Sequence, residues 1–263
     1  MKRLKRYQYE RYAILCQLAY PDTPNTYKNV ISPFHQIQLT DKYGRMSVRL
    51  LWQDDKKEVI IVFRGSLGLK DWLGNCCCFP SKLNVYNDSY NVHWGFKRLL
   101  DAPLYPSSIS PDGKLHSLRQ VLYHSLTPLL KQGKRFSFIG HSSGGAVAVL
   151  MADYYERVHP KSVKRVVTFG QPAAGSLSFR RKYKLHNRTY RICCDLDMIT
   201  YLPPIPYYFW HVGKMLWLHD EQIYENTPTL QRLSMSLKSW LLRPITYHYM
   251  RKYIRNKSLF DEH

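Results

Sequence analysis

Short apolar runs separated by polar turns recur along the chain, and they predict two kinds of element. Runs rich in β-branched and aromatic residues predict buried strands, and they occupy residues 47–53, 58–63, 136–140, 163–169 and 189–194. Apolar residues at helical spacing predict helices over residues 6–20, 96–101, 115–130 and 143–158. Strands that alternate with helices in this way predict an α/β fold.

Length and composition are those of one globular domain. The chain has 263 residues, of which 44% are hydrophobic, so we expect a single domain over residues 1–263 with a substantial core. No apolar run approaches the length of a membrane-spanning helix. The N-terminus begins with basic residues, but residues 7–11 interrupt any hydrophobic segment, so no signal peptide is expected. These features predict a cytoplasmic or peripheral membrane protein and leave open secretion by a signal-independent route.

The six cysteines form no pattern typical of a disulfide framework or a zinc site. They are Cys16, the run Cys76, Cys77 and Cys78, and the pair Cys193 and Cys194. Adjacent cysteines do not readily bridge each other and no C-x-x-C spacing occurs, so we expect reduced thiols and no metal site. The run of three fits either apolar packing or palmitoylation, and the sequence leaves both open.

The formal net charge of +20 is the most unusual global property. Between Lys161 and Arg191 there are nine lysines or arginines and no acidic residue. Such a field attracts anions, either phospholipid headgroups or nucleic acid. The chain has no pattern typical of a nucleic-acid-binding module, so specific nucleic-acid binding is not expected. Peripheral association with an anionic membrane and a merely solvated basic surface remain as equal alternatives.

The sequence Gly-His-Ser-Ser-Gly at residues 140–144 has the form G-x-S-x-G and lies between a predicted strand and a predicted helix. That context is typical of a nucleophile elbow, in which a serine occupies the tight turn between the two elements. Glycines flank the serine because the two backbones approach closely there. Ser142 is therefore the candidate nucleophile, and His141 occupies the variable position before it. The alternative is an ordinary glycine-rich turn.

A serine that attacks an ester needs hydrogen-bond donors aimed at the oxyanion that forms. In serine hydrolases with this layout, one donor is the backbone N–H after the nucleophile, which here belongs to Ser143. The other comes from an early loop at the end of a strand, and the strand at residues 58–63 leads directly to Ser66. Spacing alone does not separate this role of Ser66 from that of a simple turn residue beside Gly65.

Five short segments occur in an order and at a spacing that match one known family throughout the chain. They are residues 62–66 (Val-Phe-Arg-Gly-Ser), 71–73 (Asp-Trp-Leu), 92–96 (Val-His-Trp-Gly-Phe), 140–145 and 168–172 (Thr-Phe-Gly-Gln-Pro). Together they resemble the class 3 lipase family of α/β-hydrolases. The resemblance implies an α/β-hydrolase fold, with a central, mostly parallel sheet flanked by helices and a short lid after the first oxyanion strand.

The resemblance also implies roles for the residues around Ser66. It makes Ser66 the oxyanion-hole residue and makes about residues 67–80 the lid, which includes the cysteine run. Leu69, Trp72 and Leu73 would then bind lipid or substrate, because an apolar flap hinged on glycines can cover the serine in water and lie on lipid when open. The alternative is a loop whose Trp72 packs into the core.

Two aspartates follow the predicted strand at residues 189–194, at the kind of strand end where catalytic residues gather. Asp197 begins the sequence Asp-Met-Ile-Thr-Tyr-Leu-Pro-Pro, which resembles the family pattern D-x-V-P-x-L-P-P except that Thr200 replaces the usual proline. The resemblance implies that Asp197 is the acid that orients the catalytic histidine and stabilises its charged form. Asp195 is expected to cap the turn or to pair with a basic residue.

The histidine comes last, because the chain order in α/β-hydrolases is Ser, Asp, His. His248, followed by Tyr253, resembles the late histidine of the family, with a tyrosine about a turn further on. His211 resembles a family element that is not itself catalytic, and His219 is expected to lie on the surface. His93 is expected to support the oxyanion side through hydrogen bonding.

These residues predict a serine-dependent carboxylic-ester hydrolase that acts on lipid esters, most simply acylglycerols, at an interface. The proposed chemistry requires no metal and no cofactor. Because the net charge favours anionic interfaces, phospholipase A1 or lysophospholipase activity is the alternative. An alternative of another class is a basic membrane- or nucleic-acid-binding protein on an inactive hydrolase fold, although binding would not require Ser142, Asp197 and His248.

Overall fold

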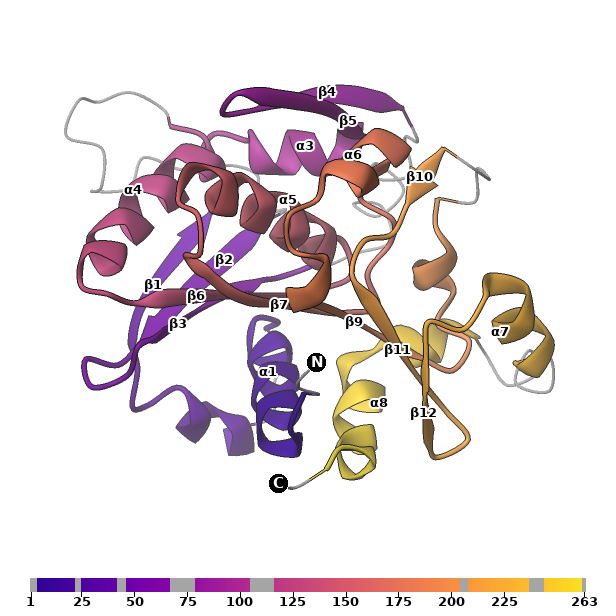
Figure 1. Cartoon of the computed structure of the whole chain (residues 1–263). Coiled ribbons are helices and arrows are strands. Elements are labelled where there is room, and N and C mark those ends of the chain that lie inside the picture. The colour runs from indigo at the N-terminus through magenta and orange to yellow at the C-terminus, as the bar shows by residue number, and fades with distance from the viewer. Residues whose placement is uncertain are drawn as a thin grey trace.

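The structure, a computed structural model, describes residues 4–21, 25–41, 46–66, 79–104, 116–203, 208–236 and 244–261. Within these ranges one large sheet lies between two layers of helices (Figure 1). The predicted lid residues Leu69, Trp72 and Leu73 and the cysteine run lie outside the described residues.

The described part of the large sheet has eight strands. They are β1 (His35–Thr40), β2 (Ser47–Trp52), β3 (Glu58–Phe63), β6 (Arg135–His141), β7 (Val163–Phe169), β9 (Thr189–Cys194), β11 (Lys214–His219) and β12 (Gln222–Glu225). Their order across the sheet is β1-β2-β3-β6-β7-β9-β11-β12. The strands from β3 to β11 run parallel to their neighbours, and antiparallel strands join only at the two edges. The predicted mostly parallel sheet is therefore confirmed.

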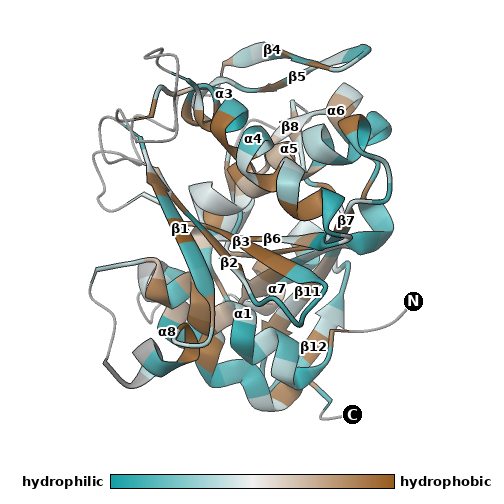
Figure 2. Cartoon of the chain, turned by 90° about the vertical axis from the view of Figure 1, so that its left-hand side faces the viewer, coloured by the Kyte–Doolittle hydropathy of each residue, from teal (hydrophilic) through white to brown (hydrophobic). Residues whose placement is uncertain are grey.

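The central strands are apolar on both faces because helices cover both faces. In β3, Val59, Ile61 and Phe63 belong to the core on one side of the sheet, and Ile60 and Val62 belong to the core on the other. This two-sided burial explains the unbroken apolar runs in the sequence, which are typical of parallel strands. Figure 2 shows the hydrophobic colour on these strands and on the helices to either side.

Two groups of helices form the layers seen in Figure 1. One face carries α1 (Arg6–Leu18) and α8 (Met250–Arg255), which pack against each other, and the other carries α3 (Trp94–Leu100), α4 (Leu118–Lys131), α5 (Ser143–Val158) and α6 (Leu177–Lys182). A further helix, α7 (Thr229–Met235), follows the last strand. The four predicted helices correspond to α1, α3, α4 and α5. None of the helices in the described ranges combines the length and apolarity needed to cross a bilayer.

A second, smaller sheet was not predicted from the apolar pattern. It contains β4 (Pro80–Val85), β5 (Asp88–His93), β8 (Gly175–Ser176) and β10 (Phe209–Trp210) in the order β10-β8-β5-β4. The β4–β5 hairpin is only half-buried, and β8 and β10 are two residues long. The strands β8 and β10 form because segments distant in sequence meet, as Val92 does with Gly175, so no local signal marks them.

A buried charge cluster holds α5 against the small sheet. The carboxylate of Asp153, which has no solvent exposure, accepts hydrogen bonds from the hydroxyl of Tyr90 and from Arg157 Nε, the latter at 2.7 Å. A buried carboxylate is tolerated only when hydrogen bonds and charge satisfy it. These contacts therefore fix the C-terminal half of the helix that begins immediately after Ser142.

Gly144→Ala is expected to disrupt the junction of strand and helix. A Cβ at Gly144 would lie 2.6 Å from the carbonyl carbon of Arg64 and closer still to the carbonyl oxygen of Phe63, and backbone atoms cannot swing aside. We expect the free energy of unfolding to fall by at least about 3 kcal/mol.

Gly133→Ala is the matched control. Gly133 has a φ of +75°, but a Cβ there would meet nothing within 4 Å, so alanine should cost only about 1–2 kcal/mol of backbone strain. Urea denaturation of both variants measures the difference, and equal losses would contradict the close approach at Gly144.

Candidate active site

Ser142 occupies a strained turn between β6 and α5. Its φ of 57° and ψ of −133° are rarely adopted by a residue with a side chain, and its backbone N–H donates to the carbonyl oxygen of Phe169 at 2.9 Å. A Cβ at Gly140 would lie 2.6 Å from the carbonyl oxygen of Gly144, so the close approach predicted for these glycines is present. This is the geometry of a nucleophile elbow, with Ser142 only 4% exposed.

Asp197 and His248 meet although they are far apart in the sequence. Asp197 follows β9 and caps the short 3₁₀ helix η3 (Met198–Tyr201), whereas His248 ends the 3₁₀ helix η5 (Pro244–His248). His248 Nδ1 lies 3.0 Å from each carboxylate oxygen of Asp197. A carboxylate only accepts hydrogen bonds, so Nδ1 carries the proton and Nε2 is left as a proton acceptor. This tautomer is the one a general base requires.

The carboxylate of Asp197 is fully buried and receives several hydrogen bonds. Besides His248, the backbone N–H of Ile199 donates to Oδ1 at 3.0 Å and the hydroxyl of Tyr253 donates to Oδ2. Burial alone would raise the pKa of Asp197, but the charge of His248 and the hydrogen bonds from His248 and Tyr253 together hold that pKa below its usual value. Asp197 is therefore charged at neutral pH.

Gly170 brings the nucleophile and the Asp–His pair together. It follows Phe169, whose carbonyl oxygen accepts the N–H of Ser142, and it has a φ of +57°. A Cβ at Gly170 would lie 2.6 Å from Asp197 Oδ2 and 2.9 Å from His248 Nδ1. Only glycine leaves room for the carboxylate and the imidazole at this point of the sheet edge.

The predicted oxyanion residues lie beside Ser142 and contact each other. A Cβ at Gly65 would lie 2.9 Å from the Cβ of Ser142, which shows how near this loop is. The backbone N–H of Ser66 donates to Ser143 Oγ at 3.1 Å, and the two hydroxyl oxygens are also 3.1 Å apart. The Ser66 amide, which the sequence predicts to be an oxyanion donor, therefore donates to the hydroxyl of Ser143 in this structure.

The competing aspartate and histidines lie elsewhere. Asp195 pairs with His219, whose Nδ1 is 3.0 Å from Asp195 Oδ1. The prediction that His219 lies on the surface is wrong: it is 4% exposed, because its ring stacks on Trp217 with a centroid distance of 4.4 Å. His211 Nε2 lies 3.0 Å from the carbonyl oxygen of Thr200. Burial and then the charge of a nearby arginine lower the pKa of His211 well below its usual value.

His93 serves the helix that follows it. Its Nδ1 accepts the backbone N–H of Gly95 at 3.1 Å, which caps α3, and burial lowers its pKa to about 4. Its ring stacks on Phe96. This hydrogen bond shows a capping role, and the contribution of His93 to the oxyanion side stays a prediction.

Of the segment predicted to form the lid, residues 67–80, only Phe79 and Pro80 lie within the described residues. Phe79 is 67% exposed, and Pro80, the last residue predicted for the lid, is the first residue of β4.

Two tyrosines near the site were given no role by the sequence. Tyr253 was recognised as part of a pattern around His248, but its hydrogen bond to Asp197 became visible only in the fold. Tyr20 follows α1, and its hydroxyl lies 2.7 Å from His141 Nδ1. Since 121 positions separate these two residues, no local signal could have found the contact.

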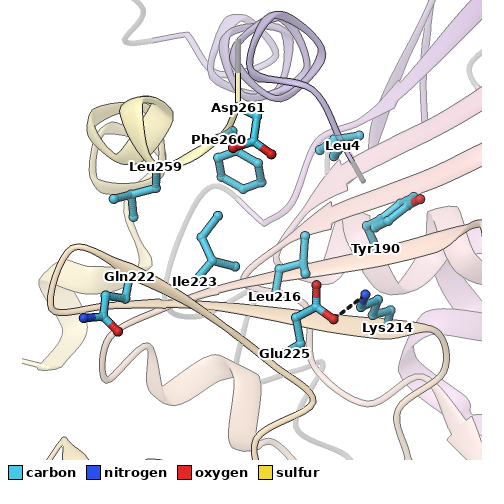
Figure 3. A pocket seen from close by; sticks show the side chains of 10 residues that line it. All are labelled: Leu4, Tyr190, Lys214, Leu216, Gln222, Ile223, Glu225, Leu259, Phe260 and Asp261. Carbon is cyan, nitrogen blue, oxygen red and sulfur yellow. Dashed lines mark ion pairs between the residues drawn. The ribbon is translucent and has the colours of Figure 1, made fainter. Parts of the chain in front are cut away.

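A cavity of about 260 Å³ lies at another place, where both ends of the described chain meet the sheet (Figure 3). Its lining comes from the starts of β9 and β11, from β12 and from the chain ends, and comprises Leu4, Tyr190, Lys214, Leu216, Gln222, Ile223, Glu225, Leu259, Phe260 and Asp261. Lys214 and Glu225 form an ion pair across it. None of the predicted catalytic residues lines this cavity.

The described residues offer no group of His, Cys, Asp and Glu side chains arranged to hold a metal ion. Cys16, Cys193 and Cys194 are buried free thiols.

Comparison with known proteins gives a consistent result. The family model described as Lipase (class 3) matches residues 60–207, which is more than half of the chain. A lipase from Rhizomucor miehei is 28% identical over 176 residues, covering 64% of this chain and 43% of that protein. Phospholipase A(1) DAD1, chloroplastic, from Arabidopsis thaliana is 28% identical over 165 residues, covering 57% of this chain and 34% of that protein. The matched stretches thus span less than half the length of both relatives.

The fold is shared with a solved fungal lipase. The structure of Rhizomucor miehei triacylglyceride lipase matches with a TM-score of 0.70 at 21% identity, covering 93% of each chain. A likeness at this identity shows the fold alone. The predicted α/β-hydrolase fold, with its mostly parallel sheet flanked by helices, is confirmed.

Tyr253→Phe should weaken the protein in a pH-dependent way. Because the folded-state pKa of Asp197 is lowered, its contribution to stability is present above the unfolded pKa of about 4 and is lost as pH falls through the folded pKa. Removing the Tyr253 hydroxyl removes part of that contribution, about 1–3 kcal/mol at neutral pH. The gap in unfolding free energy between wild type and variant should narrow below about pH 4.

Tyr9→Phe provides the control for this measurement. The Tyr9 hydroxyl donates to the backbone carbonyl of Tyr253 at 2.6 Å and is equally buried, but its acceptor does not titrate. Urea denaturation between pH 3 and pH 7 should give a loss that stays constant for Tyr9→Phe. If the loss of unfolding free energy in Tyr253→Phe were also independent of pH, the Tyr253 hydroxyl would not be coupled to the ionisation of Asp197.

Proposed function

The chain belongs to the class 3 lipase family, and on that premise we propose that it is a serine carboxylic-ester hydrolase that acts on lipid esters. The observation that carries the proposal is the pairing of a strained elbow serine, Ser142, with a histidine whose Nδ1 lies 3.0 Å from both oxygens of the buried carboxylate of Asp197. A nucleophile, a base of fixed tautomer and a buried acid are the parts that acyl transfer requires.

In the proposed reaction, Ser142 Oγ attacks the ester carbonyl carbon while His248 Nε2 removes the hydroxyl proton. The backbone N–H groups of Ser66 and Ser143 hold the oxyanion of the tetrahedral intermediate. The intermediate collapses as the bond to the alcohol breaks, and His248 gives its proton to the leaving alcohol. Water then attacks the acyl-enzyme through the same base, which releases the fatty acid and restores Ser142.

Asp197 keeps its negative charge throughout and stabilises the imidazolium of His248. Its lowered pKa supports this role, because the carboxylate stays charged well below neutral pH. The substrate oxygen must replace the hydroxyl of Ser143, which accepts the Ser66 N–H at 3.1 Å. These steps draw only on groups of the chain, the ester and water.

We infer that acylglycerols are the preferred esters, and the likeness to a lipase from Rhizomucor miehei supports this choice. Phospholipase A1 or lysophospholipase activity is the second candidate. Two observations favour it: the likeness to phospholipase A(1) DAD1 and the net charge of +20, which would attract anionic headgroups. A binding protein on an inactive fold is disfavoured, because binding gives no reason to keep the Ser142, His248 and Asp197 arrangement.

We also propose that about residues 67–80 form a lid and that the protein is cytoplasmic or associates peripherally with a membrane. Leu69, Trp72 and Leu73 give this segment its apolar character, and it directly follows Ser66 of the proposed oxyanion hole. An apolar segment at that position would cover the serine in water and contact lipid when open.

Ser142→Ala tests the nucleophile. A fluorophosphonate probe, applied with mixed micelles so that lipid is present, should label the wild type and fail to label Ser142→Ala, because only an activated serine reacts. Ser178→Ala, which changes an exposed serine on α6, should label at the wild-type rate. Absence of labelling in the wild type under these conditions would contradict the enzyme assignment.

The substrate class is tested with triacylglycerol, monoacylglycerol and phospholipid presented in matched vesicles. We expect acylglycerols to be hydrolysed fastest. Adding anionic lipid to neutral ester vesicles should raise turnover, and high salt should cancel the increase, because salt screens the attraction between surface charges. Faster phospholipid hydrolysis would favour the second candidate, and a rate independent of anionic lipid would show that the charge has another role.

A further inference from the structure

A chain of three hydrogen bonds joins the loop before Ser66 to the backbone of His248. The N–H of Gly65 donates to the hydroxyl oxygen of Tyr20 at 3.1 Å. The hydroxyl of Tyr20 lies 2.7 Å from His141 Nδ1, and His141 Nε2 lies 2.7 Å from the carbonyl oxygen of His248. This series of hydrogen bonds begins at Gly65, beside the proposed oxyanion hole. It passes through His141, the residue before the proposed nucleophile, and ends at the backbone of His248, the proposed base.

Each hydrogen bond in this chain has one allowed direction. A carbonyl oxygen only accepts, so His141 Nε2 carries a proton and its Nδ1 is an acceptor. The hydroxyl of Tyr20 must then donate to His141, which leaves its oxygen free to accept the N–H of Gly65. Burial, followed by the charge of His248, lowers the pKa of His141 to about 3, so this neutral tautomer persists at neutral pH.

His141 also touches the ring of His248. The two imidazoles are 4.5 Å apart between centroids with an interplanar angle of 31°, and Tyr20 meets the edge of His141 with a centroid distance of 5.6 Å. His141 is 6% exposed. The base is therefore held at three points: Asp197 at Nδ1, and His141 at the ring face and at the backbone carbonyl.

We propose that Tyr20 and His141 are positioning residues that set His248 and the Gly65–Ser66 loop at fixed places on the two sides of Ser142. This inference rests on the proposed function. The base, His248, and the oxyanion donor Ser66 come from segments far from Ser142 in the sequence, so their mutual position needs a direct link. Reacting groups displaced by about 1 Å lose about 100-fold in rate, which makes such a link valuable.

The neutrality of His141 has a second consequence. When His248 takes the proton of Ser142 it becomes positively charged, and a charged neighbour stacked at 4.5 Å would oppose that step. A neutral His141, fixed by Tyr20 on one nitrogen and by a carbonyl on the other, adds contact without adding charge.

The test uses the full-length chain with Tyr20→Phe and His141→Phe, which keep an aromatic ring and remove the hydrogen bonds. On a water-soluble short-chain p-nitrophenyl ester, each should lower kcat about 10- to 100-fold and leave KM within about twofold. His141→Gln restores one acceptor and one donor at similar separation, so it should recover most of the loss seen in His141→Phe. The proton NMR signal of the His248–Asp197 hydrogen bond should shift or broaden in both phenylalanine variants.

Tyr12→Phe is the matched control. Tyr12 is a buried tyrosine of α1, and its hydroxyl donates to Glu58 at 2.8 Å, away from the site. It should lose stability in urea denaturation but keep wild-type kcat. An unchanged kcat and NMR signal in Tyr20→Phe, or no recovery in His141→Gln, would overturn the inference.

Fluorophosphonate labelling of the wild type distinguishes failure of the positioning role from failure of the proposed function. If the wild type is labelled at Ser142 and Tyr20→Phe is labelled equally fast, the positioning role is wrong and the proposed function stands. If the wild type itself is not labelled, the proposed function fails and the inference fails with it.

Discussion

The strained backbone of Ser142 is the constraint on which the rest of the site depends. A φ of 57° at a residue with a side chain costs about 1–3 kcal/mol, and it persists only where the surroundings determine it. Here β6 fixes the backbone before Ser142, and the buried helix α5 fixes the backbone after it. The carbonyl oxygen of Phe169 accepts the N–H of Ser142. Glycine at positions 140 and 144 lets the backbones approach closely enough for this turn to exist.

The electrostatics of the interior follow from that turn. One carboxylate, Asp197, is buried near the nucleophile and stays charged because His248, Tyr253 and the N–H of Ile199 donate to it. The other histidine against the site, His141, is held neutral by burial and by its neighbour's charge. Among the described residues, Asp197 thus supplies a fixed negative charge beside His248, and this arrangement favours a transient positive charge on His248.

The surface has the opposite character. The formal net charge of +20 lies on a chain in which the buried carboxylates of the described residues all accept hydrogen bonds within the fold; they are Asp41, Asp153, Glu156 and Asp197. Basic groups are therefore in large excess over the acidic groups that remain to pair with them. In the proposed function, ester cleavage depends on buried groups and attraction to an anionic surface depends on the excess of basic groups, so a change in surface charge should alter which interface the protein meets without altering the proposed triad.

The parts of the fold and site whose signals are local could be predicted from the sequence. The apolar runs of the central strands, the glycines around Ser142 and the strand that leads into Ser66 depend on neighbouring residues, and each was predicted close to its observed place. The choice of Asp197 and His248 came from a family resemblance, and in the fold these two side chains are in contact.

Only the tertiary structure decided what depends on distant segments meeting. It separated the pair of Asp197 and His248 from the pair of Asp195 and His219, and it buried His219 by stacking it on Trp217. It completed the small sheet with β8 and β10, two-residue strands that have no pattern of their own. It also brought the hydroxyl of Tyr20 into hydrogen-bond contact with His141, because the segment after α1 packs beside the turn that contains Ser142. Periodicity reports which face of an element is buried, but only the packed fold decides which polar atoms become partners there.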